Sequence, residues 1–199
     1  MTSTLNPSID TLMAANAADT KYGTGTYLAV GERNDGTGLV RRTLIKFDFV
    51  AAGIPANAVV DAVTLRLYCI TDYADNAHTF RVYRTKRAWV ETEATWNSWK
   101  TGSTWSTAGG FNVDDCEQTD IGYRAFTATE TLNVYKEFTL TASSIQEMIS
   151  GAFANNGFLI KADTEVNDCY NFNSLNAGSN MPELVVTWHA AGYPKIMWF

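Results

Sequence analysis

The chain has 199 residues, of which 46% are hydrophobic and 18% are charged, and its formal net charge at pH 7 is −6. Such a chain can build the core of one all-β domain, and its acidic balance disfavours binding to nucleic-acid phosphates. No apolar run is long enough to span a membrane, and the N-terminus lacks the basic and apolar regions of a secretion signal. We therefore expect no nucleic-acid partner and no membrane insertion, and either a removed signal or production in the cytoplasm.

Two early segments alternate between apolar and polar side chains. Residues 42–49 place Ile45 and Phe47 on one face, and residues 63–69 repeat the pattern. This is the period of a strand with one buried and one solvated face. Because a Gly53-Ile54-Pro55 turn lies between them, the two strands predict an antiparallel sheet that packs on a second layer.

Turn residues recur at short intervals along the rest of the chain, which favours an antiparallel sandwich over a parallel sheet. We expect further strands near residues 27–30, 79–84, 135–140, 157–161, 170–174 and 183–188. A helical period at Ile145, Met148 and Ile149, with capping-box spacing before it and Gly151 after it, predicts one short helix near residues 143–150. This helix is expected to cover an open end of the sandwich.

The sequence thus predicts an all-β fold, an antiparallel jelly-roll β-sandwich with one short helix. Residues 1–191 form the single domain, and residues 192–199 form an apolar C-terminal tail. The three cysteines, Cys69, Cys116 and Cys169, match neither a disulfide framework nor the spacing of metal ligands. Cys69 is expected in the core, and a Cys116–Cys169 disulfide remains open.

Several short sequence blocks follow one another in a recognisable order. They are Asp10-Thr11, residues 22–28, the strand at 42–49, the turn at 53–58, the strand at 62–68, Val82-Tyr83-Arg84, Trp89 with Glu91, residues 95–97, Gly109-Gly110, the helix at Ile145, and residues 155–161, 172–174 and 182–186. This order resembles the DNRLRE-domain family, which is related to disaggregatase repeats and to alginate-binding carbohydrate modules. The resemblance implies a jelly-roll β-sandwich without catalytic activity, a type found in secreted and surface proteins and in phage proteins.

Tryptophans and arginines supply the candidates for glycan binding. Trp89 and Trp96 are expected to pack beneath a long loop. Trp99 and Trp105 lie in the polar stretch 97–106, where an exposed indole could stack on a sugar ring or pack against neighbouring loops.

A second glycan-binding candidate lies on the outer faces of the predicted strands. There Arg66 and Arg81, with Tyr68 and Tyr83, could line a groove for an anionic glycan or form a solvated face of cross-strand pairs.

The acidic residues Asp114, Asp115, Glu117 and Asp120 follow closely on one another. Their carboxylates could converge on a structural Ca²⁺ ion, or they could form a solvated acidic loop. No nucleophile elbow, zinc-protease motif or phosphate-binding glycine loop is present, although two carboxylates acting on a glycosidic bond stay open. We expect no enzyme activity and no cofactor. His78 and His189 are expected to be isolated residues at the surface or at strand ends.

Four apolar residues, Ile196, Met197, Trp198 and Phe199, end the chain. Such an end needs to be buried, either on its own sheet or on a neighbouring subunit or scaffold.

The favoured expectation of function is a non-catalytic structural or display module of a larger assembly. The assembly we favour is a phage virion, with the chain made in the host cytoplasm and carried on the virion surface as a decoration, fibre or attachment protein. The protein would be a homo-oligomer or bound to a scaffold. The alternative is an extracellular carbohydrate-binding module for anionic polysaccharide that uses Trp99, Trp105, Tyr83 and nearby arginines.

Overall fold

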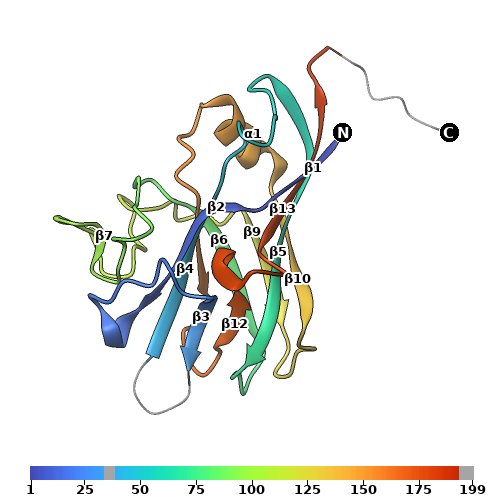
Figure 1. Ribbon diagram of the computed structural model, residues 1–199. Helices are drawn as coiled ribbons and strands as arrows, with labels where there is room; N and C mark the ends of the chain where they lie inside the picture. Colours follow the sequence, from blue (N-terminus) through green and yellow to red (C-terminus); the bar gives the residue numbers. More distant parts are fainter. Residues whose placement is uncertain (34–38, 193–199) are drawn as a thin grey trace.

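The computed structural model describes residues 1–33 and 39–192, and it confirms the all-β fold with one short helix (Figure 1). The strands are β1 (Thr2–Leu5), β2 (Pro7–Ala14), β3 (Tyr27–Arg33), β4 (Leu39–Phe47), β5 (Ala58–Asp72), β6 (His78–Arg84), β7 (Ser98–Lys100), β8 (Ser103–Thr104), β9 (Gly122–Phe126), β10 (Val134–Leu140), β11 (Phe158–Ala162), β12 (Tyr170–Asn173) and β13 (Glu183–Ala190). The helices are α1 (Ala142–Ser150) and two 3₁₀ turns at Ala15–Ala17 and Leu175–Ala177. In the described part of the chain, no helix has the length and apolar character needed to cross a membrane.

Every strand expected from the sequence is present, although the bounds shift by a few residues. The strands that the sequence analysis missed lack a clear alternation. β2, for example, is buried on both faces over most of its length, and its buried residues include the polar Asp10 and Thr11 as well as apolar side chains.

The predicted helix is confirmed as α1. It ends at Gly151, whose φ of 81° is the left-handed conformation that glycine adopts without strain. The predicted capping box does not form, since the helix begins after Thr141 and Glu147 instead pairs with Arg84. The apolar side of α1 joins the core. Figure 1 shows the helix at one end of the sheet.

The main sheet closes on itself. Its strands pair in the order β5-β10-β9-β6-β11-β4-β3-β12, and β12 then pairs with β5 to complete a ring of eight strands. β13 and β1 extend from β5, and β2 pairs with β4. The sequence predicted two separate stacked layers. In the structure β9 pairs with both β6 and β10, and β12 pairs with both β3 and β5, so these two strands join the layers, here called walls, into one closed sheet.

The two alternating strands belong to one antiparallel sheet, as expected, but they do not pair with each other. β4 pairs with β2, β3 and β11, while β5 pairs with β10, β12 and β13. The connecting residues make their own turn, in which the amide of Ile54 donates to the carbonyl of Phe49, and Ile54 is buried. Each strand therefore offers its apolar face to the same core from a different wall.

Aromatic side chains fill the centre of the closed sheet. Phe126 lies among them, with its ring centre 4.7 Å from that of Phe80, 4.9 Å from Tyr170 and 6.0 Å from Phe138. These rings pack at tilted angles, which suit the charge distribution of aromatic faces and edges.

Residues 85–117 form a second layer over the outer face of β4, β11 and β6. Leu44, Tyr83 and Leu159 point outward from these strands and pack with Trp89 and Trp105 of the layer in a second apolar cluster. In Figure 1 the part of this segment that carries β7 lies to one side of β4. The central strands are therefore buried on both faces.

Replacing Phe126 by alanine should test the central aromatic cluster. Removal of a fully buried phenylalanine leaves a cavity and typically lowers the free energy of unfolding by about 3–5 kcal/mol. Val50→Ala is the control, because Val50 is 85% exposed and its truncation should change the free energy by less than about 0.5 kcal/mol. Urea unfolding monitors both variants, and a loss below about 1 kcal/mol for Phe126→Ala would contradict this account of the core.

Candidate functional site

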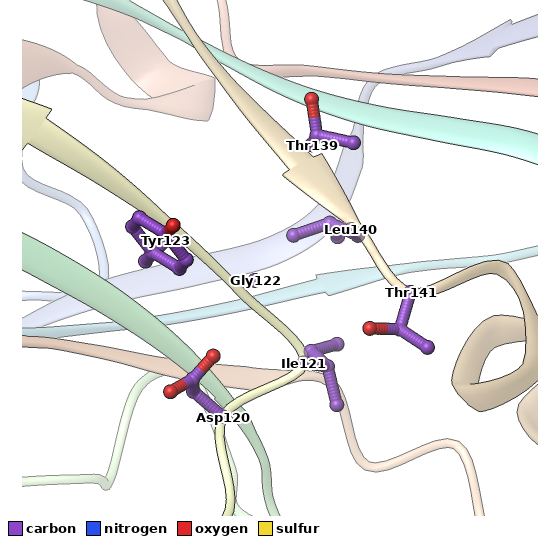
Figure 2. Close-up of a pocket in the computed structure, with 7 residues that line it drawn as sticks. All are labelled: Asp120, Ile121, Gly122, Tyr123, Thr139, Leu140 and Thr141. Carbon is purple, nitrogen blue, oxygen red and sulfur yellow. The ribbon is translucent and has the colours of Figure 1, made fainter.

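A surface hollow of about 510 Å³ lies where β9 meets β10 (Figure 2). The two strands share only a short register, in which Thr139 faces Tyr123 and Leu140 faces Gly122. Figure 2 shows Tyr123 and Asp120 on one side of the hollow, with Thr139, Leu140 and Thr141 on the other. The hollow is lined by Asp120, Ile121, Gly122, Tyr123, Thr139, Leu140 and Thr141.

Gly122 allows the two strands to approach each other at this point. A Cβ atom on Gly122 would lie 2.4 Å from the carbonyl oxygen of Thr139 and 2.7 Å from Cδ2 of Leu140. Real Cβ atoms do not come so close, so any side chain would push β9 away from β10. The shape of the hollow therefore depends on a glycine.

Tyr123 presents an exposed aromatic ring at the hollow. The residue is 59% exposed, more than any other aromatic residue that the structure describes. The guanidinium of Arg81 lies 5.4 Å from the ring centre, within the range of a cation–π contact. The neighbouring β6 strand therefore supports the ring while leaving it open to solvent.

Two carboxylates hold Arg81 in place. Nε and Nη2 of Arg81 donate to Asp163, and Nη1 donates to Oδ2 of Asp120 at 2.7 Å. The hydrogen bonds that Arg81 donates to Asp163 and then to Asp120 raise the pKa of Arg81, so the guanidinium stays charged. One positive charge thus faces two negative charges, and the neighbourhood of Tyr123 is acidic on balance.

Threonine hydroxyls line the opposite side of the hollow. Thr139 and Thr141 are both exposed. Thr141 occupies the N-cap position of α1, yet its side chain makes no capping hydrogen bond, so the hydroxyl is available to a ligand. An aromatic ring, two hydroxyls and a partly exposed carboxylate suit non-covalent binding of a polar ring with one apolar face.

The two arginines expected to share a groove lie apart. Arg66 on β5 pairs with Glu183 and Glu137 and stacks on Tyr135, while Arg81 lies on β6, beyond β10 and β9. Tyr83, the aromatic residue expected beside them, is only 6% exposed and packs against Phe111. These residues therefore do not form a shared basic groove, and the other alternative left open by the sequence, ion pairs between neighbouring segments, describes Arg66 and Arg81.

The tryptophans belong to the second layer. Trp89 and Trp96 pack beneath the long segment as expected. Of the two alternatives left open for Trp105, the structure shows packing against neighbouring loops, because the residue is 5% exposed and its indole N–H donates to the carbonyl of Thr95 at 2.9 Å. Trp99 is partly buried against the same cluster, and Nζ of Lys100 lies 4.6 Å from the centre of its ring.

The four acidic candidates for a metal site do not converge. Asp115 is buried and pairs with Arg87, Glu117 pairs with Arg84, Asp120 pairs with Arg81, and Asp114 is exposed. Over residues 1–33 and 39–192, no group of three or more His, Cys, Asp or Glu side chains is placed to hold a metal ion. Three of the four carboxylates bind three different arginines, and these ion pairs hold them apart.

The cysteines are all free and buried, so the Cys116–Cys169 disulfide left open by the sequence does not form. Cys116 packs in the second layer, whereas Cys169 packs with Leu12 and Ala29. Burial raises the pKa of each of the three thiols to about 11. Cys69 lies in the core, as expected.

Both histidines lie at strand ends, as expected, and each has an acidic neighbour. Nδ1 of His189 lies 2.9 Å from Oδ2 of Asp61. Nδ1 of His78 lies 3.6 Å from Oδ2 of Asp168, and the two side chains are buried together. Burial lowers the pKa of His78 and raises that of Asp168 to about 7.

Asp10 is a second buried carboxyl group with a raised pKa. Its Oδ2 accepts a hydrogen bond of 2.7 Å from the amide of Leu175, and its amide donates to Oε1 of Glu91. Burial, together with the nearby charge of Glu91, raises the pKa of Asp10 from 3.8 to about 7. Asp10, Glu91 and Leu175 are distant in sequence, and these hydrogen bonds bring them together.

The exposed ring of Tyr123 is the feature of the hollow that the sequence analysis missed. β9 was not predicted, because Arg124 lies on its inward side between Gly122 and Phe126 and breaks the apolar alternation. Arg124 is accommodated there by Glu130, which also binds Lys136. The docking candidates Ile196, Met197, Trp198 and Phe199 lie outside the described residues.

Comparison with known proteins gives one family. The family model described as the disaggregatase related repeat domain matches residues 10–186, which is most of the chain. No curated protein matches the chain.

The buried carboxyl group of Asp10 should make stability depend on pH. The folded state keeps this proton at pH values where the unfolded chain has lost it, so the free energy of unfolding falls as the pH rises from about 4 to about 7. Asp10→Asn retains an acceptor oxygen for Leu175 and removes this loss. The variant should match the parent near pH 4 and exceed it at pH 8 by up to about 4 kcal/mol.

Urea unfolding at the two pH values measures this difference. Asp168 titrates in the same direction in parent and variant, so it cancels from the comparison. Asp114→Asn removes an exposed carboxylate and serves as the control. If the free energy of unfolding of Asp10→Asn differed from that of the parent by the same small amount at both pH values, ionisation of Asp10 would destabilise the folded state very little.

Proposed function

The chain belongs to the disaggregatase-related repeat family, and from this premise we propose that it is a non-catalytic module displayed by a larger assembly. The family is described as a repeat domain, and this description fits a unit that works as one part of something larger. The proposal takes the closed sheet to be a jelly-roll-type sandwich whose two walls are joined by β9 and β12.

The engagement of the carboxylates with arginines carries this proposal. Asp115, Glu117 and Asp120 are three of the four acidic residues that the sequence offered as a metal site, and each is bound to an arginine within residues 81–87. A general acid or base has to exchange its proton with a substrate near the working pH. Carboxylates that tie segments together in ion pairs suit a rigid scaffold better than an active site.

We also propose that the chain is a DNRLRE-domain protein and that it lies on the surface of a phage virion, as a decoration, fibre or attachment protein. These assignments rest on the order of sequence blocks and on the apolar residues 196–199. In this proposal those residues dock the module to another subunit or to a scaffold protein.

Truncation after Gly192 tests the docking role. We expect the full chain to form a homo-oligomer and the truncated chain to be a monomer with an unchanged β-rich circular dichroism spectrum. Light scattering coupled to size-exclusion chromatography measures both masses. Equal masses for the two chains would remove docking to another copy of the chain from the proposal.

A second candidate function is polysaccharide binding, and the exposed ring of Tyr123 in its hydroxyl-lined hollow favours it. An aromatic ring can stack on the C–H face of a sugar while hydroxyls and a carboxylate bind its rim. This candidate shifts the site from Trp99, Trp105 and Arg66, where the sequence placed it, to the hollow between β9 and β10. A displayed module could combine both functions.

A glycan array tests the second candidate. We expect binding to at least one immobilised polysaccharide, and we expect Tyr123→Ala to reduce the signal about tenfold or more because the stacking surface is lost. Trp99→Ala should leave the signal unchanged. Loss of binding in Trp99→Ala but not in Tyr123→Ala would return the site to the second layer.

A further inference from the structure

The charges around Tyr123 bear on which class of sugar the hollow can accept. Arg81 is the arginine beside the ring, and three of its guanidinium nitrogens already donate to carboxylates. Asp163 and Asp120 together outweigh its single positive charge. An incoming uronate carboxylate would therefore meet bound donors and a negative excess rather than a free guanidinium.

The charge of the whole chain acts in the same direction. With a formal net charge of −6, the protein repels a polyanion at long range as well as at the hollow. A neutral sugar meets no such penalty. Its hydroxyl groups can donate to Asp120 and accept from the hydroxyls of Thr139 and Thr141, which are exposed on the facing strand.

The dimensions and lining of the hollow suit a sugar better than a protein partner. A volume of about 510 Å³ is in the range of small-ligand sites. Tyr123 is the exposed aromatic residue of the lining, and its outward neighbours on β10, Glu137 and Thr139, are polar and exposed. The buried core of a protein interface is depleted of charged residues, and this surface is not.

We propose that the hollow between β9 and β10 is a binding subsite for a neutral polysaccharide, in which Tyr123 stacks on one sugar ring and Asp120, Thr139 and Thr141 bind its hydroxyls. This inference rests on the polysaccharide-binding function proposed above and adds the class of ligand. It also opposes the preference for anionic glycans that the arginines suggest when they are viewed in the sequence alone.

The test is calorimetric titration of the full chain with two sets of hexasaccharides at physiological salt. One set contains neutral hexoses linked as in cellulose, mannan and galactan, and the other contains galacturonate and mannuronate oligomers. We expect millimolar or tighter binding of at least one neutral oligomer and at least tenfold weaker binding of every uronate oligomer.

Four variants assign the binding to the hollow. Tyr123→Ala should weaken it at least tenfold, and Tyr123→Phe, which keeps the ring, should retain it. Thr141→Val keeps the shape of the side chain and should weaken binding several-fold through loss of the hydroxyl. Tyr27→Ala is the matched control, because Tyr27 on β3 is the other exposed aromatic residue that the structure describes, and it should bind as the parent does.

A charge variant examines the selectivity directly. Asp120→Asn removes one of the two carboxylates that hold Arg81, so uronate binding should rise relative to the parent at low salt, and this gain should diminish as salt is added. Circular dichroism and the melting temperature establish that each variant is folded.

The outcomes separate this inference from the function on which it rests. Uronate binding that equals or exceeds neutral-sugar binding and is lost in Tyr123→Ala would overturn the neutral class and leave polysaccharide binding standing. Neutral-sugar binding that survives Tyr123→Ala would overturn the site. Absence of binding by all the oligomers at millimolar concentration would overturn both proposals.

Discussion

The contact between Phe126 and Tyr170 joins the two strands that close the sheet. Phe126 belongs to β9 and Tyr170 to β12, and their ring centres are 4.9 Å apart in the core. β9 bridges β6 and β10, while β12 bridges β3 and β5. Both strands are short, so their hydrogen bonds alone give little stability. The buried aromatic contact lets each bridge support the other.

The candidate site depends on this closure. β9 starts at the hollow with Gly122 and Tyr123 and ends in the core with Phe126. Phe126 fixes one end of β9, and at the other end Gly122 passes close to the carbonyl of Thr139 on β10. The exposed ring is therefore carried by a strand that is anchored at its other end. Such anchoring limits the entropy that a binding site loses when it takes up a ligand.

Arginines tie the outer layer to the closed sheet. Arg84 on β6 binds Glu117 in the layer and Glu147 on α1. Arg42 on β4 binds Glu165 and the carbonyl of Gly109, and its guanidinium lies 4.9 Å from the ring centre of Trp96. The second layer is thus held by apolar packing and by charged hydrogen bonds together. Trp105 belongs to this apolar packing and donates its indole N–H to the carbonyl of Thr95, so the polar stretch around residues 97–106 does not leave it in solvent.

The local alternation of apolar and polar residues was sufficient to predict a strand where one face of the strand is buried and the other is solvated. β5 shows this best, since Val63, Leu65 and Leu67 alternate with half-exposed residues along the strand. The pattern failed for β2, which is buried on both faces, and for β9, where Arg124 sits on the inward side. Burial of an arginine or a tryptophan depends on a partner that is distant in the chain, and alternation contains no information about such partners.

By itself, the sequence determined the all-β class, the strands expected from alternation and turns, the position of α1 and the membership of the disaggregatase-related repeat family. Those properties follow from the period of side chains along a strand and from residues such as Gly151 that end an element locally. The tertiary structure alone decided which strands pair, which arginines are consumed by carboxylates and which aromatic ring stays exposed. Each of these outcomes depends on groups that approach one another only after the sheet has closed, as when Arg81 reaches both Asp120 and Asp163 beside Tyr123.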